Sequence, residues 1–251
     1  MKKVYSSKKI ADLVRLSDSY LVLKYNSDFS ENDIVPGQFV SIDAGSEFFV
    51  KRPFSIFDVS ENMVSLFIKK VGKATSKLFS LKSGTMINIL EVLGKGFTIV
   101  NGKKVALVGG GIGIAPLFFL ARKLRRENNS VDVYYGVRNK EEMFFVNNFE
   151  KLGCTLYPST DDGSSGFKGT SFDLFSKENK RYDFVYSCGP KQLLKSVSAH
   201  CLTKSIPCEI SVEEVMGCGF GVCLGCAVKT KDGYKMACKD GPVFNAEEVV
   251  L

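Results

Sequence analysis

Three cysteines lie within nine residues of one another in the segment 217–226, Gly-Cys-Gly-Phe-Gly-Val-Cys-Leu-Gly-Cys. A disulfide between two of them would leave the third unpaired, so a metal centre with a fourth thiolate is the better explanation. Cys238, twelve residues further on, is the nearest candidate for that ligand. The order is Cys218-x4-Cys223-x2-Cys226-x11-Cys238, and its first three positions have the spacing of plant-type [2Fe-2S] centres.

Glycines surround these thiols and support the same prediction. Glycine adopts backbone angles that other residues avoid, so a glycine-rich loop can curl tightly and direct N–H groups at sulfur atoms. The glycines concerned are Gly217, Gly219, Gly221 and Gly225. A structural zinc ion is the main alternative, although zinc sites usually take their thiolates from two separate short segments. Thiols that are close by chance are the remaining alternative.

The other cysteines and the single histidine offer little further chemistry. Cys154, Cys201 and Cys208 lack ligand spacing and are predicted to be buried as small apolar side chains. His200 is the only histidine, which argues against a histidine dyad or a histidine-rich metal site, and we expect it on a helix surface. The formal charge of +7 is scattered, with no basic and aromatic residues interleaved, so nucleic-acid binding is a weak hypothesis.

A glycine-rich turn lies in the segment 108–117, Val-Gly-Gly-Gly-Ile-Gly-Ile-Ala-Pro-Leu, between a strand-like run and a helical pattern. A pyrophosphate binds well to the free N–H groups of a helix N-terminus. The usual dinucleotide fingerprint fails, because Ile114 or Pro116 occupies the third glycine position in the two registers. The glycines alone therefore leave a phosphate site and a tight structural turn as alternatives.

The elements that must position these segments change character near residue 100. Before it, short β-rich runs separated by turn residues are typical of an antiparallel barrel or sandwich. The strands predicted there are 20–25, 38–43, 63–70 and 86–93.

After residue 100, strand-like runs alternate with helical patterns, which predicts a parallel sheet with crossover helices. The predicted strands are 103–111, 131–139, 154–160, 184–190 and 207–214, and the predicted helices are 115–129, 141–153, 172–180 and 191–205. We predict three parts: a β-domain at 1–100, an α/β domain at 101–206 and a small cysteine-bearing domain at 207–251. The absence of a signal-peptide pattern or a long apolar run leads us to expect a cytoplasmic protein.

Three short motifs together carry a resemblance to a known family. Gly111-x-Gly113-x-x-Pro116-Leu117 resembles the pyridine-nucleotide turn of the ferredoxin–NADP reductase superfamily. Arg52-Pro53-Phe54-Ser55, between two β-runs, resembles the flavin signature of that superfamily, and Cys188-Gly189-Pro190 resembles the turn beside its nicotinamide. With the C-terminal cysteines, the combination resembles the electron-transfer subunits of B-type dihydroorotate dehydrogenase over essentially the whole chain.

The resemblance implies a fold and a set of cofactors. It implies a β-barrel that binds FAD, an α/β domain that binds NAD and a C-terminal [2Fe-2S] domain. The partner that it implies is an FMN-containing catalytic subunit that oxidises dihydroorotate in pyrimidine synthesis, with two copies of each subunit in a heterotetramer. Electrons would then pass from FMN through the cluster and FAD to NAD⁺.

The resemblance also implies roles for particular residues. Arg52 would neutralise the FAD pyrophosphate and Ser55 would hydrogen-bond the isoalloxazine ring. Phe67, Ile68 and Lys69 match the strand that lines the flavin, although ordinary barrel core explains Phe67 and Ile68 equally well. Ala74-Thr75 stands where the family usually has Gly-Thr near the phosphates, and the alanine departs from that pattern.

No catalytic residue is predicted, because the flavin and the cluster supply the redox chemistry. Cys188 is expected either to position the nicotinamide or to be a structural thiol. The preference for NAD over NADP is implied by the family only.

Three other functions remain open. One is the small subunit of an NADH-dependent ferredoxin:NADP oxidoreductase or sulfide dehydrogenase, in which an aspartate commonly stands at the first cluster position, where this chain has Cys218. Another is a diaphorase-type subunit of a hydrogenase. The third is a zinc-stabilised binding module without enzymatic activity.

Overall fold

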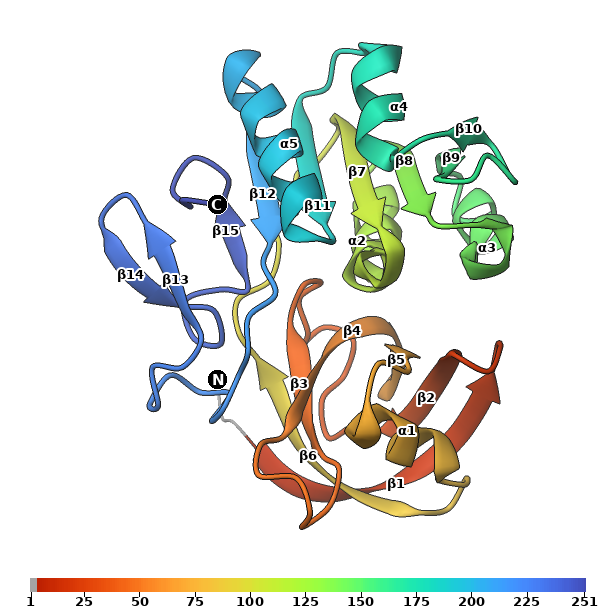
Figure 1. Ribbon diagram of the computed structural model, residues 1–251, viewed down its shortest axis with the longest axis vertical. Helices are drawn as coiled ribbons and strands as arrows, with labels where there is room; N and C mark the ends of the chain where they lie inside the picture. The colour runs from red at the N-terminus through yellow and green to blue at the C-terminus, as the bar shows by residue number, and fades with distance from the viewer. Residues whose placement is uncertain (1–3) are drawn as a thin grey trace.

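The computed structural model describes residues 4–251, and its N-terminal part is a closed antiparallel barrel with the strand order β1-β2-β5-β4-β3-β6 (Figure 1). The strands are β1 (Val4–Arg15), β2 (Tyr20–Asn26), β3 (Phe39–Asp43), β4 (Arg52–Ser60), β5 (Met63–Lys69) and β6 (Met86–Leu93). Alternation along β2 shows how the barrel is filled, because Leu21 and Leu23 point into its core while Tyr20 and Val22 pack toward the second domain. The predicted barrel is therefore confirmed.

The sequence-based prediction lacked two strands of the barrel, β1 and β4, and its helix α1. The Arg52–Ser55 motif does not lie between strands but begins β4, where Pro53 pairs with Ser41 of β3. Helix α1 (Lys73–Ser80) buries Leu78 and Phe79 in the barrel core. Proline and mixed polar residues obscure the period-two signal of β4.

The second domain is built on a seven-stranded sheet with the order β10-β9-β8-β7-β11-β12-β15. Its strands are β7 (Lys104–Gly110), β8 (Ser130–Val137), β9 (Thr155–Thr160), β10 (Phe167–Lys168), β11 (Phe184–Cys188), β12 (Cys208–Ser211) and β15 (Val243–Asn245). All neighbouring pairs are parallel except β12 with β15. The parallel sheet predicted from the alternating pattern is confirmed.

Helices cover both faces of this sheet. They are η1 (Gly111–Gly113), α2 (Ile114–Arg126), η2 (Lys140–Glu142), α3 (Val146–Lys151), α4 (Ser171–Glu178) and α5 (Lys191–Thr203). Along β7, Val105 and Leu107 pack with α2, whereas Ala106 and Val108 pack with α4 and α5. Among residues 4–251, no helix is long and apolar enough to cross a bilayer.

One predicted helix is wrong. The segment 141–153 does not form a single helix, because Phe145 adopts a left-handed backbone conformation with φ 65° between η2 and α3. The rings of Phe144 and Phe145 pack against Phe67 of the barrel at centroid distances of 5.9 and 5.0 Å. Packing against the other domain therefore overrides the local helical preference.

The C-terminal segment forms a hairpin of β13 (Ala227–Thr230) and β14 (Gly233–Met236) beside the sheet (Figure 1). The cysteine-rich loop lies between β12 and β13. Because β12 and β15 both belong to the seven-stranded sheet, the sheet takes strands from both sides of residue 206. The domain limits 1–100, 101–206 and 207–251 stay predictions.

Helix α2 connects the barrel with the sheet. It packs on β7, β8 and β11 and also on β4 of the barrel. Phe119 is fully buried in the barrel core, and Phe118 stacks on Phe57 of β4 at 4.7 Å. Any displacement of this helix therefore disturbs both domains.

Candidate cofactor sites

The four predicted cluster ligands meet as two pairs. The backbone N–H of Cys218 donates to Sγ of Cys223 at 3.4 Å, and the backbone N–H of Cys238 donates to Sγ of Cys226 at 3.4 Å. The two pairs lie close together, because a Cβ added to Gly221 of the cysteine loop would lie 2.7 Å from the side chain of Lys239, the neighbour of Cys238. Cys226 and Cys238 are buried, while Cys223 is exposed at the surface.

The cysteine loop directs backbone N–H groups at one sulfur. Sγ of Cys218 accepts from the N–H groups of Phe220, Val222 and Cys223 at 3.3 to 3.5 Å. Burial acts to raise the pKa of Cys218, but the hydrogen bonds from Cys223, Phe220 and Val222 outweigh it and lower the pKa to about 6. Gly219 and Gly221, with φ of 80° and 88°, permit the curl that sequence analysis expected.

This donor arrangement fits a two-iron cluster. Each iron of a [2Fe-2S] cluster takes two thiolates. The pairs Cys218/Cys223 and Cys226/Cys238 provide two such sets.

A cavity of about 360 Å³ lies where the barrel, the sheet and the cysteine-bearing segment meet. The barrel contributes the whole Arg52–Ser55 motif, together with Phe67, Lys69 and Thr75. The α/β domain contributes Gly113, Pro116 and Cys188, and the C-terminal segment contributes Met216 and Pro242. We call it the flavin cavity, because it gathers the residues of the predicted flavin motif.

Arg52 is placed to receive an anion. Its Nη1 donates to the backbone oxygen of Val50 at 2.9 Å, and its guanidinium lies over the ring of Phe48. No carboxylate among the described residues forms an ion pair with it, so its charge is available to a bound phosphate.

Two residues of the predicted flavin site lie outside this cavity. Ile68 is fully buried in the barrel core, because strand alternation directs it away from its neighbours Phe67 and Lys69. Ala74 is buried in α1, while Thr75 beside it lines the cavity. The Thr75 hydroxyl also accepts hydrogen bonds from the N–H groups of Val71 and Gly72.

A larger cavity of about 650 Å³ adjoins the flavin cavity, and we call it the nucleotide cavity. Gly110, Gly111 and Ile112 line it at the start of α2, and Gly189 and Pro190 line it after β11. Gly111 has φ 55°, and nothing lies within 4 Å of the position that a Cβ would take there. A helix N-terminus with open space before it is suited to a pyrophosphate.

Three residues line both cavities: Lys69, Ile112 and Glu213. Sequence analysis missed Glu213, which follows β12 and belongs to no motif that we recognised. Glu213 is accessible to solvent, but partial desolvation by the neighbouring protein atoms raises the pKa of its carboxyl. Burial and the charge of Glu213 raise the pKa of the Cys188 thiol.

Glu142 was also missed. Its carboxylate accepts hydrogen bonds from Tyr20 Oη at 2.9 Å and Lys69 Nζ at 3.2 Å, which joins the barrel to η2 at the wall of the nucleotide cavity. Only the long-range fold brings these three side chains together.

Cys154, Cys201 and Cys208 are buried, as predicted. His200 lies on α5 but is partly covered by the rings of Phe172 and Phe175, so it is less exposed than the prediction of a surface position implied.

The fold agrees with solved oxidoreductase structures. The NADH-dependent reduced ferredoxin-NADP oxidoreductase has a chain that superposes with a TM-score of 0.88 at 30% identity, over 97% of this chain and 89% of that one. A ferredoxin NADP⁺ reductase from Neisseria gonorrhoeae with bound FAD and NADP superposes with a TM-score of 0.66 at 16% identity, over 79% and 91% of the chains. The fold and the adjoining cavities define an oxidoreductase of the ferredoxin reductase type with an added iron–sulfur domain.

Sequence relatives identify the family. Residues 213–250 match the iron-sulfur cluster binding domain of dihydroorotate dehydrogenase B, and residues 107–199 match the oxidoreductase NAD-binding domain. The dihydroorotate dehydrogenase B (NAD(+)) electron transfer subunit of Caldanaerobacter subterraneus is 41% identical over 86% of this chain and 87% of its own length. The electron transfer subunit of Clostridium acetobutylicum is 40% identical over 100% of this chain and 99% of its own length. The chain therefore belongs to the family of dihydroorotate dehydrogenase B electron transfer subunits.

Family membership confirms the predicted cofactors. The chain is a flavoprotein oxidoreductase subunit with FAD, a [2Fe-2S] cluster and NAD as its cofactors. The individual residues that hold each group stay predictions.

Proposed function

We propose that this chain carries electrons from an FMN-containing subunit that oxidises dihydroorotate, through its cluster and FAD, to NAD⁺. The observation that carries the proposal is the composition of the flavin cavity. Arg52 from the barrel, Cys188 from the sheet and Met216 from the cysteine-bearing segment all line this one space. The cavity shares lining residues with the nucleotide cavity, and Met216 lies two residues before Cys218, so a flavin held there would be placed to act as a relay between the two sites.

The chain's residues hold and orient the cofactors in this scheme. Bound FAD exchanges electrons singly with an iron–sulfur cluster and in pairs, as hydride, with NAD⁺. Arg52 neutralises the FAD pyrophosphate, Thr75 lies near its phosphates and Ser55 hydrogen-bonds the isoalloxazine ring. The N–H groups at Gly111 and the turn at Gly189-Pro190 bind NAD⁺, and Cys218, Cys223, Cys226 and Cys238 hold the cluster.

In this proposal the catalytic subunit docks beside the cysteine loop, residues 217–226. Apolar side chains surround Cys223, and Val215, Val222 and Leu224 are exposed to 81%, 72% and 64%. Exposed apolar side chains in one short segment are a feature of protein interfaces, and this segment holds the thiolates through which electrons would enter. The assembly is a cytoplasmic heterotetramer with two copies of each subunit.

The test is reconstitution with the FMN-containing catalytic subunit. With both subunits present, dihydroorotate should reduce NAD⁺, and the double variant Val222→Asp/Leu224→Asp should lose binding by more than about tenfold because it buries charge at the interface. Leu202→Asp is the control, since Leu202 is also an exposed apolar residue, at 47%, and belongs to helix α5 rather than to the cysteine loop. Wild-type binding by the double variant would contradict the docking surface.

A second function is favoured by one observation, the TM-score of 0.88 with the NADH-dependent reduced ferredoxin-NADP oxidoreductase. That function requires a different partner and transfer to NADP. If the chain reduced NADP with reduced ferredoxin, and failed to couple dihydroorotate oxidation to NAD⁺, the second function would replace the first.

A further inference from the structure

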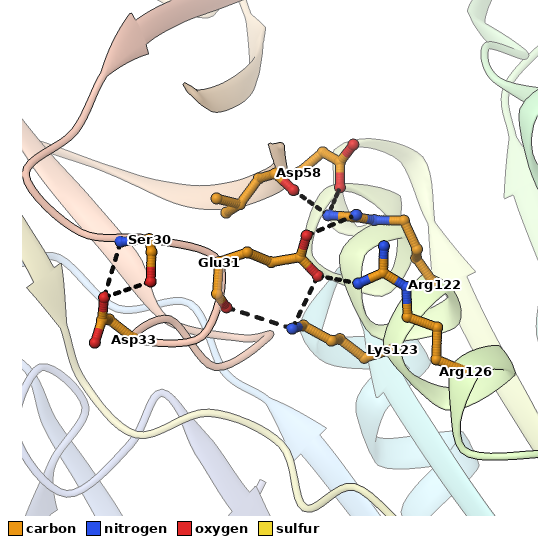
Figure 2. Close-up of polar contacts among 8 residues, drawn as sticks. Ser30, Glu31, Asp33, Asp58, Arg122, Lys123 and Arg126 are labelled. Carbon is orange, nitrogen blue, oxygen red and sulfur yellow. Dashed lines mark hydrogen bonds and ion pairs between the residues drawn. The ribbon is translucent and has the colours of Figure 1, made fainter. Parts of the chain in front are cut away.

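A single carboxylate of the barrel binds three cations of α2. Glu31 lies in the loop between β2 and β3, and its Oε2 is 3.1 Å from Arg122 Nη1 while its Oε1 is 2.9 Å from Lys123 Nζ (Figure 2). Arg126 also pairs with Oε1, and Lys123 donates a second hydrogen bond to the backbone oxygen of Glu31. The loop thus binds the C-terminal half of α2 through several contacts at once.

Arg122 binds the barrel at a second point. Its Nη2 is 2.6 Å from Oδ1 of Asp58 and donates to the backbone oxygen of Val59, so its guanidinium bridges the loop and the end of β4 (Figure 2). The side chains of Arg122, Glu31 and Asp58 are only 14%, 16% and 27% exposed. Partly buried and multiply bonded pairs hold their geometry better than isolated surface pairs.

We call Glu31, Asp58, Arg122, Lys123 and Arg126 the α2 clamp. Burial opposes ionisation of Glu31, but its bond to Lys123 and the charges of Arg122 and Arg126 lower its pKa, so it stays charged at neutral pH. The clamp contains two carboxylates and three cations, and it is therefore nearly balanced in charge.

The position of the clamp gives it consequences for the cofactor cavities. The same two elements that it joins, β4 and α2, begin at the flavin cavity, with Arg52–Ser55 on β4 and Gly113 and Pro116 at the start of α2. The clamp joins the opposite ends of these elements, and the stacked rings of Phe57 and Phe118 lie between. The spacing of the cavity walls therefore depends on the angle between β4 and α2, which the clamp fixes.

A small change in the angle between β4 and α2 produces a large displacement of the first turn of α2, which lies at the cavities. The clamp cations of α2, at 122–126, lie about eight residues or about 12 Å from its first turn, so a tilt of about 5° about the clamp would move that turn by about 1 Å. Hydride transfer needs the reacting atoms about 3 to 3.5 Å apart, and a misplacement of about 1 Å can cost about a hundredfold in rate.

We propose that the α2 clamp is a positioning device that sets the distance between the flavin and nucleotide cavities, with Glu31 and Arg122 as positioning residues for hydride transfer. The inference rests on the proposed function in taking FAD and NAD to occupy these cavities. None of the clamp residues lines either cavity, so the clamp acts only through β4 and α2.

The test compares Glu31→Gln with Glu47→Gln in the complete complex. Glu47 pairs with Lys77 inside the barrel domain alone, so its variant removes an ion pair without loosening α2. Stopped-flow reduction of FAD by NADH should slow about tenfold in Glu31→Gln and stay within about twofold in Glu47→Gln. The long-wavelength charge-transfer absorbance between flavin and nicotinamide should fall in Glu31→Gln, while FAD content and the dissociation constant for NADH stay within about twofold.

Arg122→Gln and the double variant Glu31→Gln/Arg122→Gln complete a thermodynamic cycle. Because the two residues share one interaction, the double variant should slow FAD reduction by less than the product of the single effects. If Arg122→Gln fails to fold, Lys123→Gln replaces it in the cycle, with a smaller effect in the same direction.

Two outcomes would overturn the inference, and a third would refute the proposed function on which it rests. The inference would be overturned if Glu31→Gln lowered the unfolding temperature but kept wild-type FAD reduction and charge-transfer absorbance. It would also be overturned if the double variant slowed FAD reduction by the full product of the two single-variant effects. Failure of NADH to reduce FAD in the wild-type complex would instead refute the proposed function and would be seen before any variant is made.

Discussion

Gly113 at the start of α2 packs directly against the backbone carbonyl of Cys188 at the end of β11. A Cβ added to Gly113 would overlap the carbonyl oxygen and carbon of Cys188 and the Cα of Gly189. Two motifs separated by more than seventy residues in sequence are thereby joined backbone to backbone. The contact also forms part of the boundary between the flavin and nucleotide cavities, since Gly113 and Cys188 line the first and Gly189 the second.

This contact predicts the effect of Gly113→Ala. Since backbone atoms cannot move aside as a flexible side chain can, we expect a loss of about 3 kcal/mol in the free energy of unfolding, with weaker NADH binding. Gly102→Ala is the control, because nothing lies within 4 Å of a Cβ there and only its φ of 63° carries a cost, about 1 kcal/mol. Urea unfolding and NADH titration measure both effects. Equal stability of the two variants would contradict the packing argument.

Cys226→Ser is predicted to abolish the cluster and leave the flavin in place. Cys226 is buried beside Cys238, so its loss removes one of the two thiolates that hold one iron. Visible absorbance of the cluster, together with iron and sulfide analysis, should show the loss, while FAD stays at the wild-type content. Cys201→Ala, at a buried thiol of α5, should keep the full cluster. Retention of iron and sulfide in Cys226→Ser would refute the ligand assignment.

Glu213→Gln is predicted to slow reduction of FAD by NADH. Glu213 lines both cavities, where the nicotinamide ring gains positive charge as hydride leaves it. Removing a nearby negative charge should slow the step about tenfold, or about 1.4 kcal/mol in the barrier. Glu150→Gln is the control, because Glu150 is exposed on α3 and lines neither cavity. Stopped-flow spectroscopy checks the effect, and equal rates for the two variants would exclude this role.

His200 is predicted to make stability depend on pH. Burial against Phe172 and Phe175, with the charge of Lys204, lowers its pKa below the model-peptide value of 6.5. The folded state therefore resists protonation more than the unfolded state does, so its contribution to stability is present above pH 6.5 and is lost as the pH falls below it. Urea midpoints at about pH 7.5 and about pH 5.5 should differ less in His200→Gln than in the wild-type protein. An unchanged difference would show that other groups cause the pH dependence.

The segment 141–153 shows where a local pattern fails to predict secondary structure, because the single helix expected there is interrupted at Phe145. Its apolar spacing is helical, but Phe144 and Phe145 pack on Phe67 of the barrel and divide the segment. The Arg52–Ser55 strand was missed for a related reason, because a strand that contains proline and few alternating apolar residues is defined by its neighbours in the barrel. The strands β2, β3, β5 to β9, β11 and β12 and the helices α2, α4 and α5 were predicted well, since their periodicity is a local property, whereas β1, α1 and the short strands β10 and β13 to β15 were not predicted.

The sequence by itself determined the chemistry of this protein. Ligand spacing at Cys218, Cys223 and Cys226 and the motifs at Arg52 and Gly111 are properties of short segments, so they can be read without a fold. Only the tertiary structure decided how those segments meet. Glu213 lies between two cavities, and Glu31 forms ion pairs with α2. Both arrangements depend on contacts between distant parts of the chain. Such contacts arise from packing of whole elements, which no local period or spacing records.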